Sequence, residues 1–142
     1  MSGAWTRGPL LTTELGQLVV MHADDEGIWV AGVNGAALLR PDLGPLRVLR
    51  VPVDLPGPVT SITRSGGYLW IGTRYGLARY DGVRLVDYSA ELTNVEEDYL
   101  DVRGLAEDAE GRVWLHTPTA LVCYTEGRFT KFSLEESPGA GE

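Results

Sequence analysis

The sequence predicts an all-β chain built from three four-stranded antiparallel sheets, and three observations lead to that fold class. First, Trp29, Trp70 and Trp114 recur at separations of 41 and 44 residues. Second, each tryptophan belongs to a set of four short apolar runs that repeats with it. Third, glycine-bearing turns separate the runs. Four short strands in each repeat of about 40 residues are typical of propeller blades, so the pattern favours a partial β-propeller.

The middle repeat is the clearest. Residues 67–82 read as a β-hairpin, in which an apolar run centred on Trp70 leads through a glycine-bearing turn into a second run ending at Asp81. An inner run at Val59–Ile62 precedes this hairpin, and an outer run at Leu85–Val86 follows it. The corresponding inner, third and outer runs are Leu18–Met21, Ala37–Leu39 and Val48–Leu49 in the first repeat, and Val102–Leu105, Leu121–Tyr124 and Phe129–Thr130 in the last.

The repeats divide the chain into a short extension, three blades and a tail. We expect an N-terminal extension over 1–16, a three-blade segment over 17–133 and a disordered tail over 134–142, which is rich in Gly, Pro and Glu. The predicted blades cover 17–52, 59–89 and 102–133. The stretch Ala90–Leu105 is the only one long enough to compete as a helix. Its apolar positions keep no steady face, so a loop with at most one helical turn is expected.

Blade packing explains the residue types in each run. The inner strands of a blade are covered on both faces by neighbouring sheets, so they are apolar throughout instead of alternating. Charged residues bracket the outer runs and discourage edge-to-edge pairing. The turns before the tryptophans, such as Asp108–Gly111, combine an acidic or hydroxyl side chain with glycine, as tight hairpins require. Calcium binding by these carboxylates is the alternative interpretation.

Composition limits the partners and the compartment. The 142-residue chain has a formal net charge of −8 and no cluster of Lys and Arg, so nucleic acid and membrane surfaces are not expected partners. Its start lacks the apolar core of a signal peptide, and no apolar run reaches membrane-spanning length, which predicts a cytoplasmic location. The alternative is that the sequence is part of a larger exported protein. Cys123 is the only cysteine, so no intrachain disulfide can form, and a buried apolar role is expected.

The residues also carry a family resemblance. The stretches Asp108–Trp114 and Leu69–Asp81 resemble the two-component-regulator propeller repeat, in which an Asp-Gly turn precedes Trp-Ile-Gly-Thr, Gly-Leu and an aromatic-Asp ending. The middle repeat matches nearly in full. The last repeat has His116-Thr117-Pro118 in place of Gly-Thr, and the first reads Asn34-Gly35-Ala36 in place of Gly-Leu. The resemblance spans about residues 18–133 and implies a propeller that senses a ligand or binds a partner, with a role in signalling and without chemistry of its own.

Three blades are too few to close a ring, because propellers contain about 4–8. Two apolar blade faces would therefore be bare, and large bare apolar faces mark interaction surfaces. We expect two copies to meet head-to-tail and form a six-bladed homodimer. The alternatives are that the chain completes a propeller begun by another protein, or that it is a fragment or an arc that does not close.

The candidate binding residues lie in turns. The connections between blades and the middle hairpin turns usually form the recognition surface of a propeller, where a small-molecule ligand or a protein would bind. Asn34, Arg74, Tyr75, Asn94 and His116 lie in or near these segments. Arg74 and Tyr75 pair a bidentate donor with an aromatic ring, two residue types enriched at hot spots. For each residue taken singly, a solvated turn is the alternative.

No motif predicts catalysis. The sequence has no phosphate-binding loop, no metal-ligand spacing and no nucleophile elbow, so neither a cofactor nor a metal is expected. The alternative is a small propeller enzyme of lyase or hydrolase type that uses His116. No second residue is tied to His116 by spacing, and a packing role for it is favoured.

Overall fold

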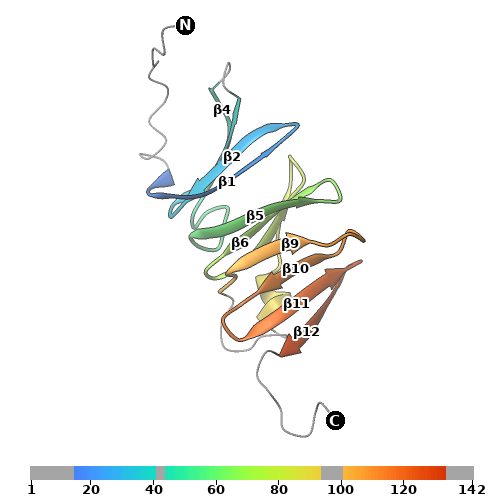
Figure 1. The fold of residues 1–142 in the computed structure, drawn as a ribbon. Helices are drawn as coiled ribbons and strands as arrows, with labels where there is room; N and C mark the ends of the chain where they lie inside the picture. The colour runs from blue at the N-terminus through green and yellow to red at the C-terminus, as the bar shows by residue number, and fades with distance from the viewer. Residues whose placement is uncertain (1–14, 41–43, 94–100, 134–142) are drawn as a thin grey trace, which may run out of the picture.

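The computed structural model describes residues 15–40, 44–93 and 101–133, and this part of the chain forms three four-stranded antiparallel sheets. Figure 1 shows the sheets stacked in chain order, with the first strands β1, β5 and β9 lying side by side. This arrangement confirms the predicted all-β fold class of a partial propeller. The extension up to residue 14 and the tail from residue 134 lie outside the described residues.

Each sheet has its strands in sequence order. The first sheet comprises β1 (Leu18–Asp24), β2 (Gly27–Gly32), β3 (Gly35–Arg40) and β4 (Gly44–Arg50). The second comprises β5 (Val59–Ser65), β6 (Tyr68–Thr73), β7 (Gly76–Tyr80) and β8 (Leu85–Asp87). The third comprises β9 (Gly104–Glu107), β10 (Val113–His116), β11 (Ala120–Thr125) and β12 (Arg128–Ser133).

The strand register repeats from sheet to sheet. In the second strand of each sheet the tryptophan faces the same position of the third strand: Trp29 pairs with Leu38, Trp70 with Arg79, and Trp114 with Cys123. The first strands β1 and β5 also share an irregularity at their start. The three sheets are therefore structural equivalents, and a residue in one sheet has a definable counterpart in the others.

The connection between the second and third sheets differs slightly from the prediction. A short helix, α2 (Ser89–Thr93), supplies the helical turn, and Leu92 is buried. Strand β9 begins at Gly104 instead of Val102, because the Val102 amide donates a hydrogen bond of 2.9 Å to the Thr73 carbonyl of the second sheet. That amide is therefore unavailable to the third sheet.

Two apolar layers hold the sheets together. Between the first and second sheets, Trp29 meets Leu69 and Ile71, and its ring lies edge-on to Tyr80 with centroids 5.9 Å apart. Between the second and third sheets, Trp70 packs with Val113 and Leu115. The second sheet is thus buried on both faces, as its uninterrupted apolar run in β6 predicts.

The two ends of the stacked sheets carry different turns. At one end, which we call the hairpin end, Arg64 forms an ion pair of 2.8 Å with Asp24, and Ser65 donates a hydrogen bond of 2.8 Å to Glu107. These contacts bring the first hairpin turns of the three sheets together. The other end, which we call the crossing end, holds the segments that connect one sheet to the next and the middle hairpin turns.

Candidate functional site

The sequence-predicted binding residues line the crossing end. Asn34, Arg74, Tyr75 and His116 are all exposed, and each of the three sheets contributes at least one of them. No hydrogen bond or ion pair joins these four side chains in the part of the chain that the structure describes. The fifth residue, Asn94, lies outside the described residues. The crossing end thus presents separate polar side chains, and their role in binding stays a prediction.

His116 lies at the end of β10 with its ring against the backbone of the neighbouring strand. A Cβ atom added at Gly104 would lie 2.6 Å from His116 Nε2, so the glycine leaves room for the imidazole. Within the described ranges, no carboxylate forms an ion pair with His116. His116 is exposed and its ring lies against Gly104, and its role, in packing or otherwise, stays a prediction.

The hollows between sheets lie at the hairpin end. The first groove, between the first two sheets, has a volume of about 420 Å³, and the second groove, between the last two, about 320 Å³. The first groove is lined by Glu26, Trp29, Leu38, Arg47, Tyr80 and Gly82. The second groove is lined by Ser65, Gly66, Tyr68, Trp70, Arg79, residues 110–113, Tyr124, Thr125 and Glu126.

Sequence reasoning missed both grooves, because each forms between residues of two different sheets. The register of the repeat could have located them. The tryptophan, its partner on the third strand, and a tyrosine of the next sheet line both grooves: Trp29, Leu38 and Tyr80 in the first, and Trp70, Arg79 and Tyr124 in the second.

Aromatic rings surround Arg79 in the second groove. Its guanidinium carbon lies 4.0 Å from the centroid of the Tyr68 ring, 5.7 Å from Trp70 and 5.5 Å from Tyr88. Burial among these rings, with the hydroxyl of Tyr124 close by, raises the pKa of Tyr88 to about 12. The phenol is therefore neutral near pH 7 and offers the guanidinium no counter-charge.

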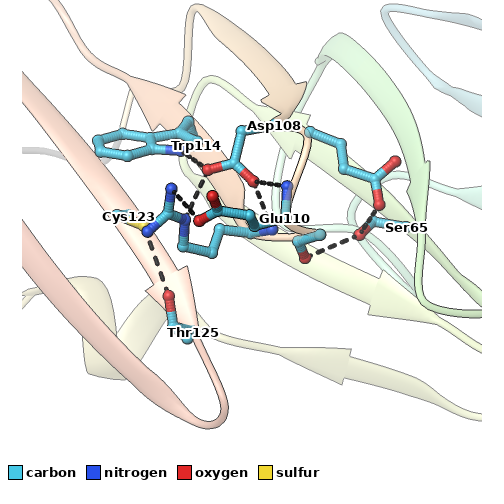
Figure 2. A network of polar contacts seen from close by, with 9 residues as sticks. Ser65, Asp108, Glu110, Trp114, Cys123 and Thr125 are labelled. Atoms are coloured by element: carbon cyan, nitrogen blue, oxygen red, sulfur yellow. Dashed lines mark hydrogen bonds and ion pairs between the residues drawn. The ribbon is translucent and has the colours of Figure 1, made fainter.

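A polar network closes the hairpin end of the third sheet (Figure 2). One carboxylate oxygen of Asp108 accepts hydrogen bonds from the backbone amides of Glu110 and Arg112, each at 2.9 Å. The other accepts from Trp114 Nε1 at 2.9 Å and from Arg112 Nε at 2.6 Å. The hydrogen bond from Trp114, joined by those from Arg112, holds the pKa of Asp108 well below its ordinary value.

This network predicts a pH-dependent effect of Asp108→Asn. An asparagine amide would present a donor where Trp114 and Arg112 also donate, so the variant should melt at a lower temperature at pH 7. Because the folded pKa of Asp108 is lowered, its stabilisation is present above the ordinary value of 3.8 and declines as the pH falls below it. Thermal melts at pH 7 and pH 3 should therefore show the gap between wild type and variant narrowing. An equal gap at both values would contradict this assignment.

The corresponding carboxylate of the first sheet is also engaged. Asp24 accepts a hydrogen bond from the Glu26 amide at 2.9 Å and pairs with Arg64. Partial burial is the largest single effect and opposes ionisation of Asp24, but the hydrogen bonds from Arg64 and the Glu26 amide and the positive charge of Arg64 together outweigh it, so the pKa of Asp24 is lowered. In the described part of the chain, no group of three or more His, Cys, Asp or Glu residues could hold a metal ion. Asp24 therefore holds its own turn and joins it to Arg64 of the second sheet, whereas Asp108 holds its own turn and Trp114.

Comparison with known proteins agrees with this architecture. No protein-family model matches the sequence, and no curated protein resembles it significantly. The structure is similar to that of the extracellular domain of the hybrid two-component system protein BT3049 from B. thetaiotaomicron, with a TM-score of 0.69 and 20% sequence identity. The match covers 86% of this chain and 18% of that one. The fold is that of a partial β-propeller.

The three sheets are therefore three blades, which we number in chain order. The chain spans less than a fifth of the length of this structural neighbour, and the likeness at this identity concerns the fold. No helix in the described residues is long and apolar enough to cross a membrane. The cytoplasmic location stays a prediction, and the neighbour is an extracellular domain.

The outer face of blade one is apolar. Val30 and Ala37 are buried there under Leu15, with Ile28, Leu39 and Val48 packed against them. Leu18, Val19 and Met21 extend this face into solvent, and Met21 is 65% exposed. No other blade of the described structure covers this face.

The outer face of blade three carries the third tryptophan. Trp114 is half-buried, and its ring lies 5.7 Å from the ring of Phe132, which is 46% exposed. Cys123, the partner of Trp114 in the register, is buried and forms no disulfide. The burial agrees with the expected apolar role of this cysteine.

Proposed function

We propose that this chain is a non-catalytic sensing or protein-interaction module that completes a propeller by pairing with a second copy of itself. One observation carries the proposal: the two open faces are the two halves of an interface that already occurs twice within the chain. The structural neighbour, an extracellular domain of a two-component system protein, supports a sensing role.

The repeated interface has a simple rule. The tryptophan of one blade shares a buried apolar cluster with the two residues that flank the tryptophan of the next blade. Trp29 clusters with Leu69 and Ile71, and Trp70 clusters with Val113 and Leu115. Two parts of this repeated interface have no partner blade in the described structure. In the described residues no blade follows Trp114. No described tryptophan precedes Ile28 and Val30 of blade one, whose cluster is covered in part by Leu15, and Trp5 lies outside the described residues.

In a pair of copies, each open face could contact the complementary open face of the other copy. The Trp114 face of each copy would meet the Val30 face of the other, which gives two equivalent seams and a ring of six blades. Six lies within the range of about 4–8 blades that closed propellers contain. A propeller-containing protein of another sequence is the alternative partner, and it would have to offer both kinds of face.

The test is the mass of the chain in solution. Native mass spectrometry and light scattering at micromolar concentration should give twice the mass of one chain. Met21→Glu and Phe132→Glu each place a charge in a seam, where leaving it unpaired is costly, so each should give a monomer. Val83→Glu is the matched control, because Val83 is 83% exposed in a turn away from both open faces. A wild-type monomer, or a dimer that tolerates both seam variants, would refute pairing through these faces.

A further inference from the structure

We propose that the second groove binds a small monocarboxylate with a flat apolar body, and that Arg79 anchors the carboxylate. The inference deepens the proposed sensing function, because it states what chemical class the module would sense. It concerns the hairpin end, whereas the predicted recognition residues lie at the crossing end.

The position of Arg79 in the repeat is the first argument. The residue opposite the tryptophan is Leu38 in blade one and Cys123 in blade three, and both are largely buried. The blade architecture therefore does not require a charge at this position. Only the second of the three blades places a cation there, and it does so where the groove has a volume of about 320 Å³.

The second argument is that Arg79 lacks an anion. Among the described residues it forms no ion pair, and its one hydrogen bond is a long one of 3.4 Å from Nη1 to the Tyr124 hydroxyl. Its Nε is buried without a partner. The faces of Tyr68, Trp70 and Tyr88 attract a cation but do not neutralise it. A carboxylate would supply both the charge and the acceptors that the guanidinium lacks.

The residues that line the groove indicate the shape and the net charge of the ligand. Tyr68, Trp70 and Tyr124 present aromatic surface, which suits a flat apolar body. The lining also carries the exposed Glu126 and a second cation, Arg112, which is paired with Glu110 at 2.9 Å and with Asp108 at 2.6 Å. Arg79 is thus the one lining arginine without an ion pair among the described residues, so a ligand with a single carboxylate matches the groove better than a dicarboxylate.

The experiment compares phenylacetate with its neutral analogue phenylacetamide by isothermal titration calorimetry. The wild-type chain should bind phenylacetate saturably, and phenylacetamide at least about tenfold more weakly, because a charge-assisted pair is lost. Arg79→Leu, which introduces the residue type found in blade one, should abolish the preference for phenylacetate. Arg40→Leu is the matched control, since it removes an exposed arginine of blade one that hydrogen-bonds the Glu26 carbonyl. It should bind phenylacetate as the wild type does.

The comparison on the wild type does not depend on any variant folding. Equal binding of acid and amide, or no saturable binding of phenylacetate, would overturn the inference. An Arg79→Leu chain that melts like the wild type and still prefers the acid would also overturn it. The mass measurement is independent of these results: loss of binding in an intact dimer would refute the groove alone, and a monomer that binds phenylacetate would refute the pairing alone.

Discussion

Trp70→Ala is expected to lower the free energy of unfolding by about 3–5 kcal/mol, the range found when large aromatic side chains are removed from cores. Trp70 is 2% exposed and lies between blades two and three. Its ring stacks on Tyr88 with centroids 5.7 Å apart, and it meets Tyr124 at 4.8 Å. The truncation would leave a cavity that these rings cannot fill, because the sheets on both sides hold their backbones in place.

Urea titration followed by circular dichroism measures this loss, at one protein concentration so that any association is held constant. Val83→Ala is the control, because it also removes apolar atoms but from a side chain that is 83% exposed. It should change stability by no more than about 0.5 kcal/mol. A Trp70→Ala chain as stable as the control would mean that the interface between blades two and three contributes little to folding.

Gly35→Ala is the second change with a large expected effect. Gly35 begins β3 with a φ of 156°, and an added Cβ would lie 2.2 Å from the Leu49 carbonyl oxygen of β4. That oxygen belongs to the backbone of a paired strand and cannot swing away as a side chain could. Strain at φ and the clash together should cost about 2–5 kcal/mol.

Gly66→Ala separates the two causes. Gly66 also has a positive φ, 61°, but no atom lies within 4 Å of the added Cβ. The free energy of unfolding of this variant should fall by only about 1–2 kcal/mol, the cost of placing a residue with a Cβ at a positive φ. Urea titrations of the two variants side by side would show the difference, and equal losses would contradict a clash with Leu49.

The fold could be predicted because its determinants are local and repeated. Each tryptophan marks a second strand, and each glycine pair or Asp-Gly turn marks a hairpin, so three sheets in sequence order follow from the spacing alone. The start of β9 could not be predicted from the same pattern. A contact with another sheet, the hydrogen bond from Val102 to Thr73, decides it.

The grooves form through contacts between blades, which a sequence pattern does not show. The sequence therefore predicted binding residues at the crossing end and not at the hairpin end. Turn residues such as Arg74 and Tyr75 stand out in a sequence because their types are common at binding sites. Arg79 does not, since it sits in an ordinary strand between Ala78 and Tyr80. Its environment becomes visible only when Tyr68, Tyr88 and Tyr124 are brought around it from neighbouring segments.

The complementarity of the two open faces has a consequence for the geometry of the proposed assembly. A contact between unlike faces closes into a ring only if each step turns by the right fraction of a circle, and otherwise it continues as a helical filament. The angle between successive sheets therefore decides between a closed particle and a fibre. Side-chain volume at the two internal layers, around Trp29 and Trp70, sets that angle. A bulkier residue in either layer should widen the wedge and convert discrete particles into polymers whose length grows with concentration.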